Sequence, residues 1–189
     1  ALSSAEVKWS DANECVLPDN SIFINNIINK MTLEQKVGQI IMPEINNITP
    51  QDAKKYHFGT ILNGGGGFPN QNKNSKINDW KKLSESYYDA STEVDGTRIP
   101  ILWGTDAVHG HNNVIGATIF PHNIGLGATR NVELIESIGQ AVAKEVASTG
   151  IIWTFAPTIA VPRNDTWGRT YEGFSENTDL VSKLGQSFI

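Results

Sequence analysis

Residues 99–113 read I-P-I-L-W-G-T-D-A-V-H-G-H-N-N. The apolar run at 99–103 predicts a buried strand, and one carboxylate, two imidazoles and two amides follow it within the eight positions 106–113. Polar side chains gathered directly behind a strand are typical of parallel α/β folds, in which the carboxyl ends of the strands form the functional face. The stretch therefore predicts a parallel sheet with Asp106 at the end of one strand.

On both sides of this stretch, short apolar runs alternate with segments of helical periodicity. Strands are expected at 58–63, 99–103 and 151–161. Helices are expected after the capping box that begins at Thr32, from Ile77, from Asn131 to a stop at Gly150, and after an N-cap at Ser175. This alternation predicts right-handed βαβ units in a parallel sheet, either closed as a barrel or open and doubly wound.

Two features favour the barrel over the open sheet. The polar residues cluster behind the strands, and no G-x-G-x-x-G follows the first strand. Only about half of the strands of a closed barrel are visible in the sequence. The predicted fold is therefore α/β, the N-terminal half of a (β/α)8 TIM-type barrel, with residues 1–30 as an N-terminal extension and 31–189 as the first, incomplete part of the barrel domain.

The composition excludes several classes of function. With 189 residues, 39% of them hydrophobic, and a mean hydropathy of -0.26, the chain can bury one sizeable core. A net charge of -5 offers no basic surface for nucleic acid. The sequence has no apolar stretch of membrane length and no signal sequence, and it begins at Ala1, so we expect a soluble chain that has been processed or trimmed. The lone Cys15 cannot form an internal disulfide.

Asp106 is open to two interpretations. At the carboxyl end of a strand, a carboxylate can accept hydrogen bonds from substrate hydroxyls or act as a catalytic base. An aspartate in the same place can equally do no more than stabilise a turn. The sequence pattern alone does not separate these roles.

His109 and His111 have the H-x-H spacing with which metal-dependent barrel hydrolases place two imidazoles on one ion. The alternative is that both hydrogen-bond inside a polar loop with the two asparagines that follow them. The second interpretation is favoured, because neither of the other histidines, His57 and His122, stands behind a strand at an obvious ligand position. We therefore expect no metal.

Residues 64–67 are four consecutive glycines that follow the first expected strand. They lack the G-K-[ST] that makes a phosphate-binding loop specific. We expect them to serve a close approach or a positive φ in a tight connection, with no cofactor.

The stretch W-G-R-T-Y-E at 167–172 follows the last expected strand. Arg169 and Glu172 form either a surface pair of little energetic value or an arginine held rigid so that its fork faces a ligand. Together with Asp106 on the neighbouring strand, they predict a two-sided clamp for a neutral, polyhydroxylated ligand. In that clamp the carboxylate accepts hydrogen bonds and the guanidinium donates them.

Several stretches stand in order along the chain: M-T-L-E-Q-K-V-G-Q (31–39), I-P (99–100) leading to G-T-D-A-V-H-G (104–110), T-I-F-P-H (118–122), G-L-G-A-T (125–129), F-A-P (155–157) and W-G-R (167–169). With these spacings they resemble the N-terminal part of the barrel domain of family 3 glycoside hydrolases. The H-G-H-N-N at 109–113 is most similar to the exo-acting β-glucan glucohydrolases and β-glucosidases of that family.

The resemblance implies a (β/α)8 barrel followed by a second α/β domain, with a glucosyl unit bound at the carboxyl face of the barrel. Asp106 matches the acidic residue that binds hydroxyls at the far end of the non-reducing sugar, and Arg169 matches the arginine that binds hydroxyls of the same unit. Glu172, His109 and His111 are expected to support these two residues. The resemblance further implies that loss of Asp106 costs the complete enzyme well over tenfold in kcat/KM.

The same resemblance implies that this chain holds no catalytic residue. The family's nucleophilic aspartate, its Lys-His pair and the acid/base glutamate of its second domain have no counterpart before Ile189, and a retaining glycosidase needs two carboxyl groups about 5 to 5.5 Å apart. The chain alone is expected to be inactive. Joined to the remainder of the barrel and the second domain, it is expected to supply a subsite -1 wall for hydrolysis of terminal non-reducing β-D-glucosyl residues from β-glucosides or β-glucans. We expect an extracellular or periplasmic location and no cofactor, nucleic acid or membrane partner.

Two other functions stay open. A metal-dependent hydrolase built on His109 and His111 would contain stoichiometric zinc and lose activity on chelation. A non-catalytic glycan-binding fragment would bind glucose in calorimetry. We expect no measurable glucose binding, because half a barrel leaves open strand edges and an incomplete pocket.

Overall fold

The computed structural model describes residues 19–93 and 98–189. The chain divides into two compact units, residues 1–32 and 33–189, which are considered separately. In the first unit, helix α1 (Ser21–Ile28) buries none of its side chains. Over both described ranges, no helix combines the length and the apolar character that crossing a bilayer would require.

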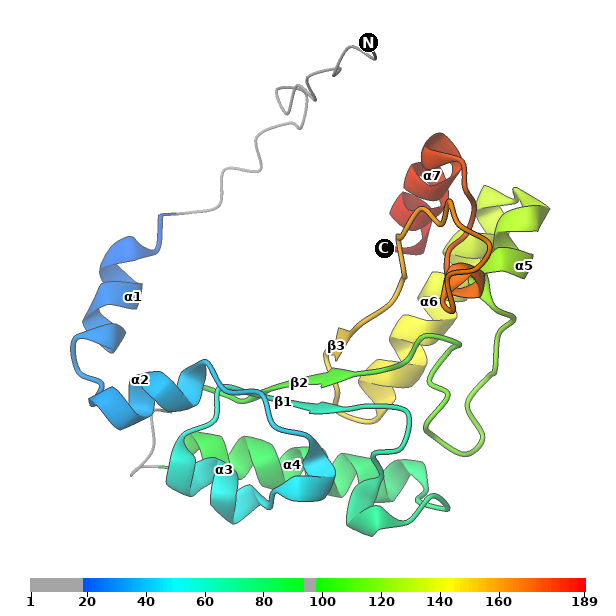
Figure 1. The fold of residues 1–189 in the computed structure, drawn as a ribbon. Coiled ribbons are helices and arrows are strands. Elements are labelled where there is room, and N and C mark those ends of the chain that lie inside the picture. The colour runs from blue at the N-terminus through cyan, green and yellow to red at the C-terminus, as the bar shows by residue number, and fades with distance from the viewer. Residues whose placement is uncertain (1–18, 94–97) are drawn as a thin grey trace. The chain divides into compact units, whose positions relative to one another are not determined.

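The second unit alternates helices and strands. In chain order it contains α2 (Leu33–Gln39), the 3-10 turn η2 (Ile45–Asn47), α3 (Pro50–Tyr56), β1 (Thr60–Asn63), the 3-10 turn η3 (Pro69–Gln71), α4 (Ile77–Thr92), β2 (Leu102–Thr105), α5 (Asn123–Thr129), α6 (Val132–Ser148), β3 (Trp153–Thr154), the 3-10 turn η4 (Thr170–Glu172) and α7 (Thr178–Phe188). Figure 1 shows α3 and α4 side by side along one face of the strands.

The strands form one parallel sheet in the order β1-β2-β3, so the predicted parallel sheet is confirmed. Leu62 pairs with Gly104, which in turn pairs with Trp153. On the other side of β1, Glu44 makes a single parallel bridge to Leu62, whose amide donates to the Pro43 carbonyl at 3.0 Å. The segment before η2 is thus a rudimentary fourth strand.

The second and third expected strands each contain a proline, and the observed strands differ from the predicted bounds. β2 begins at Leu102 rather than at 99, because Pro100 has no amide donor and the Ile101 amide donates to Ser91 Oγ at 3.0 Å instead of joining the sheet. β3 covers only Trp153–Thr154 of the expected 151–161. The Phe155 amide still donates to the Thr105 carbonyl, but Pro157, two residues further on, has no amide with which to continue a ladder. The prediction of a long third strand is therefore wrong.

Helix α6 is confirmed with its predicted ends. The Asn131 side chain accepts from the Leu134 amide at 3.0 Å, and Gly150 follows the helix with a φ of 80°. The expected cap of α7 is corrected by two residues. Asn177 is the N-cap, because its side chain accepts from Leu180, whereas Ser175 Oγ accepts from the Asn177 amide.

The expectation for the four glycines holds at one of them. A Cβ on Gly67 would overlap the Glu44 carboxylate, which is the close approach that was expected. At the other three glycines, a Cβ would meet nothing within 4 Å. The alternative, a positive φ, occurs at none of these four glycines, since among the described residues the glycines with positive φ are at 110, 116 and 150.

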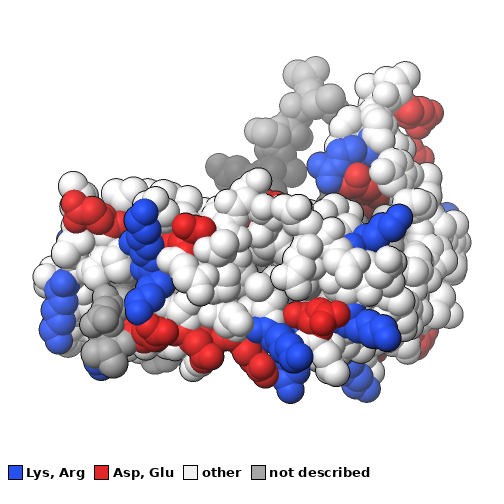
Figure 2. Space-filling view, turned by 90° about the horizontal axis from the view of Figure 1, so that it is seen from below, with Lys and Arg blue, Asp and Glu red and all other residues white. Residues whose placement is uncertain are grey.

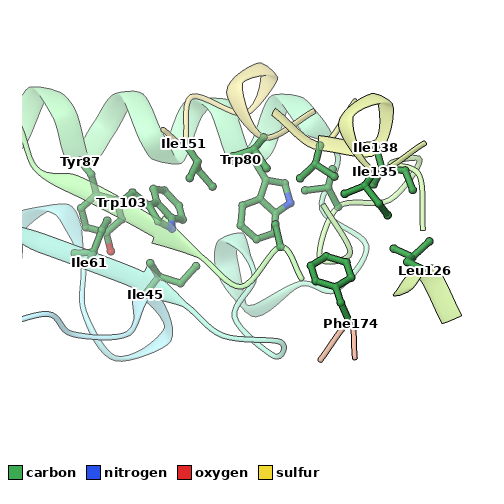
Figure 3. Close-up of a cluster of buried hydrophobic side chains, with 14 of the residues drawn as sticks. Ile45, Ile61, Trp80, Tyr87, Trp103, Leu126, Ile135, Ile138, Ile151 and Phe174 are labelled. Atoms are coloured by element: carbon green, nitrogen blue, oxygen red, sulfur yellow. The ribbon is translucent and has the colours of Figure 1, made fainter. Parts of the chain in front are cut away.

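The core lies between the sheet and its helices (Figure 3). Side chains alternate along the strands, so Ile61 and Trp103 are buried against α4 while Thr60 and Leu102 on the opposite face are half-buried. Trp103 packs against Trp80 of α4 with ring centroids 6.1 Å apart. This packing fixes the orientation of β2 and of the loop that leaves it.

Candidate functional site

Asp106 is the first residue after β2, at the carboxyl edge of the sheet. Its amide donates to the Asn63 carbonyl at 3.1 Å and the Phe155 amide donates to the Thr105 carbonyl at 3.0 Å, so the ladder holds the backbone on both sides of the strand end. Thr105 is buried toward the helices, and the side-chain alternation therefore directs Asp106 to the opposite face of the sheet. Its carboxylate is half-buried and receives no hydrogen bond from any described residue.

Arg169 precedes η4 in the loop that follows β3. Its Nε donates to Glu172 Oε1 at 2.8 Å and its Nη2 donates to Glu172 Oε2 at 2.6 Å. The Arg169 side chain is 65% exposed and the Glu172 side chain 19% exposed. Such an exposed pair adds little stability, but its two parallel bonds fix the plane of the guanidinium.

The charges of the clamp residues influence one another. Hydrogen bonding and the charge of Glu172 raise the pKa of Arg169, and the Asp106 charge acts in the same direction. Hydrogen bonding from Arg169 lowers the pKa of Glu172, and the charges of Arg169, His109 and His122 lower it further. The structure therefore brings Asp106, Arg169 and Glu172 into one electrostatic cluster.

His109 lies in this cluster, together with two residues to which the sequence analysis assigned no role in the site, His122 and Tyr171. Its ring meets the ring of His122 edge to face with centroids 4.2 Å apart, and His122 meets Tyr171 at 4.7 Å. Burial lowers the pKa of His109, and the neighbouring His122 adds to this effect. His122 is remote from any strand end in sequence, so its position gave no reason to place it in the site, although it ends the T-I-F-P-H stretch of the family resemblance.

His111 points elsewhere. Its side chain is fully buried, its Nε2 lies 3.0 Å from Thr149 Oγ1, and its ring centroid is 5.9 Å from that of Trp80. The two rings of the H-x-H pair thus belong to different clusters, His109 with His122 and His111 with the core. Within residues 19–93 and 98–189, no group of three or more His, Cys, Asp or Glu side chains is placed to hold a metal ion.

The two asparagines after the histidines stay in the loop. Asn112 Oδ1 accepts from the His109 amide at 3.2 Å, and Asn113 Nδ2 donates to the Asp106 carbonyl at 3.4 Å. These bonds run within the loop that leaves β2, but they use the backbone of His109 and Asp106. Among the described residues, neither histidine ring hydrogen-bonds to an asparagine, so the expected bonding of both rings to Asn112 and Asn113 is wrong: the His111 ring bonds to Thr149, and the Nδ1 atom of His109 is buried without a partner.

The buried His111 predicts a loss of stability in acid. Burial lowers its pKa from 6.5 to about 4, against a smaller opposing effect of Glu145. Between these two pH values the unfolded chain binds a proton that the folded chain does not, so stability falls as the pH falls. We expect the free energy of unfolding to be about 2.5 kcal/mol lower at pH 4.5 than at pH 7 because of this group. Urea unfolding at pH 7 and pH 4.5 measures the drop, and a His111→Gln variant with the same pH dependence as the wild type would contradict the assignment.

The face of the chain seen in Figure 2 carries acidic and basic side chains interspersed. A phosphate backbone is bound by a continuous basic surface. This face offers none.

The sequence model of the glycosyl hydrolase family 3 N terminal domain matches residues 32–189. The chain belongs to glycosyl hydrolase family 3. Its sequence is 52% identical to that of an exo-1,3/1,4-β-glucanase from a Pseudoalteromonas species. The crystal structure of that enzyme superposes with a TM-score of 0.84, and the match covers 91% of this chain and 22% of that one. The predicted family and the predicted partial TIM-type barrel are therefore confirmed.

Curated relatives of the chain are also glycosidases. A lysosomal β-glucosidase of Dictyostelium discoideum is 31% identical over 88% of this chain and 22% of its own length. A periplasmic β-glucosidase of Salmonella typhimurium is 28% identical over 88% of this chain and 20% of its own length. The chain thus spans about a fifth of the length of these relatives.

Proposed function

We propose that this family 3 chain forms one wall of the glucose-binding subsite -1 in an enzyme that hydrolyses terminal non-reducing β-D-glucosyl residues from β-glucosides or β-glucans. The observation that carries the proposal is the half-buried carboxylate of Asp106, which has free acceptor positions at the end of a barrel strand and lies in the electrostatic field of Arg169. The names of the relatives, β-glucosidases and an exo-1,3/1,4-β-glucanase, support this substrate class.

Asp106 and Arg169 have complementary roles in the proposal. Asp106 accepts hydrogen bonds from sugar hydroxyls. The guanidinium has five N–H donors, and Glu172 takes two of them, which leaves three for the same sugar. A hydroxyl that is missing or inverted would leave one of these groups unpaired, and such a penalty is the strongest source of selectivity available to a polar site. Glu172 and His109 support the clamp, and His111 supports its loop from the core.

The two carboxyl groups of the reaction are proposed to come from parts of the parent enzyme outside residues 1–189. A retaining mechanism needs a nucleophile and an acid/base about 5 to 5.5 Å apart. Glu172 is occupied by Arg169, and Asp106 is assigned to the hydroxyls. In this proposal residues 31–189 are the first part of the barrel domain, residues 1–30 extend it, and the remaining barrel and a second α/β domain complete the enzyme.

The reaction needs no cofactor, and we propose an extracellular or periplasmic location. One relative is periplasmic and another lysosomal, so both work outside the cytosol. A β-glucan chain or a β-glucoside is the proposed binding partner.

Hydrolysis by the full-length parent enzyme tests this function. The assay follows β-glucan oligosaccharides and an aryl β-glucoside by NMR, which reports both the sugar released and the configuration of its first-formed anomer. We expect single glucose units released from the non-reducing end as the β-anomer. Release of internal fragments, an α-anomer as first product, or no cleavage of any β-glucoside would contradict the proposal.

Removal of metal ions is expected to leave the activity unchanged. His109 and His111 lie in separate clusters, so they do not present both rings to one ion. Activity is measured before and after dialysis against EDTA, with metal content determined on the same samples. Stoichiometric zinc, together with activity that falls on chelation and returns with zinc, would favour the metal-dependent hydrolase instead.

A further inference from the structure

The loop after β2 is fastened to the loop after β3 beside the clamp, by residues that do not themselves face the sugar in the proposal. His122 is the residue before α5, and its neighbour Asn123 donates from Nδ2 to the Glu172 carbonyl at 2.9 Å. On the other side, the Phe120 amide donates to the His109 carbonyl at 3.0 Å. His122 therefore sits between the strand that bears Asp106 and the turn that bears Arg169.

Three rings bridge the same two loops. His109, His122 and Tyr171 stand in a row, each ring edge to face on the next, with centroids 4.2 and 4.7 Å apart. The row starts three residues after Asp106 and ends between Arg169 and Glu172 in sequence. Edge-to-face ring pairs stabilise the arrangement that they adopt, so these two contacts restrict movement of one loop relative to the other.

The row also lies beside the residue whose carboxylate holds the guanidinium. Asn123, directly after His122, bonds to the backbone carbonyl of Glu172. Glu172 in turn makes both hydrogen bonds that fix Arg169. The segment at His122 therefore contacts η4, the turn beside Arg169, in two places: the His122 ring meets Tyr171, and the next residue, Asn123, bonds to the Glu172 carbonyl. His122 makes no bond to Arg169 itself among the described residues.

We infer that His122 is a positioning residue, which holds the Arg169 guanidinium at its working distance from the Asp106 carboxylate through the rings of His109 and Tyr171 and through Glu172. The inference rests on the proposed function, because it concerns the same sugar clamp. Two hydrogen-bonding groups on separate loops gain selectivity only when their spacing is fixed, and a displacement of about 1 Å at a binding group can lower a rate by up to about a hundredfold.

The test compares variants of the full-length enzyme on an aryl β-glucoside. His122→Leu removes the ring from the row, and His122→Phe keeps a ring in the same place. We expect His122→Leu to raise KM and lower kcat, with a loss of about ten- to a hundredfold in kcat/KM, and His122→Phe to recover most of it. Ile124→Ala is the matched control, because this exposed residue lies two positions further along α5 and is outside the row.

A double-mutant cycle separates positioning from general structural support. If His122 acts through Arg169, then His122→Leu has little further effect in an enzyme that already carries Arg169→Ala. The inference would be overturned if the losses in kcat/KM of the two single variants multiply in the double variant. It would also be overturned if His122→Leu keeps the wild-type KM. If His122→Leu fails to fold, Tyr171→Ala breaks the row at its 43% exposed end and must give the same rise in KM and the same non-additivity.

The Asp106 and Arg169 variants test the proposed function separately from the role of His122. If Asp106→Ala and Arg169→Ala leave the kinetics unchanged, the proposed function fails at its binding site. If both impair the enzyme while the His122 and Tyr171 variants behave as wild type, only the positioning role fails.

Discussion

Replacing Asp106 with alanine in the full-length enzyme is expected to lower kcat/KM for a β-glucoside by a factor on the order of a thousand. The carboxylate is half-buried, is fixed at the strand end by the sheet ladder and receives no hydrogen bond from a described residue. Its loss leaves the sugar hydroxyls without acceptors and the remaining donors of Arg169 without an opposing charge. Because part of this binding strengthens in the transition state, kcat falls as well as KM rising.

The measurement is steady-state kinetics with a thermal melt on each variant. Asp106→Asn keeps one oxygen acceptor but loses the charge, and we expect an intermediate loss. Asp165→Ala is the control, because this aspartate is exposed in the loop before Arg169 and is expected to leave kcat/KM unchanged. Near-wild-type kinetics of Asp106→Ala in a folded enzyme would remove Asp106 from the site and leave the turn-stabilising role as its explanation.

Replacing Trp80 with alanine is expected to lower the free energy of unfolding by about 3 to 5 kcal/mol. Trp80 is fully buried on α4, and its ring lies 6.5 Å from Phe68, 6.1 Å from Trp103 and 5.9 Å from His111. The cavity left behind would adjoin β2 and the loop that follows it, and Asp106 stands where the two meet. Denaturant unfolding of the full-length enzyme, followed by the activity that remains below the transition, measures the loss.

Tyr88→Ala provides the matched control on the same helix. Tyr88 is also aromatic but 54% exposed, so its removal is expected to change the unfolding free energy by no more than about 0.5 kcal/mol. Trp80→Phe keeps most of the apolar volume and should lose less than the alanine variant. Equal stability of Trp80→Ala and Tyr88→Ala would show that the cluster drawn in Figure 3 does not carry the fold.

The parts of the fold that were predictable from the sequence are those fixed by local patterns. The parallel sheet and helix α6 follow from periodicity and from a cap, Asn131, that acts within its own first turn. The place of Asp106 follows from one apolar run and the direction of the strand. The short length of β3 was not predicted, although Pro157 stands inside the expected strand.

The remaining features depend on contacts between distant residues. His111 looks like a metal ligand until Trp80 and Thr149 are seen to enclose it, and both lie more than thirty positions away in sequence. His122 and Tyr171 join the site only because a loop returns the chain to η4. Helices α3 and α5 each have only seven residues, too few for periodicity to reveal them.

The order of the strands in the sheet has a consequence for synthesis. The segment bridged at Glu44, then β1, β2 and β3, pair strictly in the order in which they occur in the chain. Every strand therefore finds its neighbour already translated when it leaves the ribosome, and the sheet can grow from one edge without waiting for distant sequence. Asp106, at the carboxyl end of β2, can therefore form its bond to Asn63 of β1 before β3 and the turn that bears Arg169 have been translated.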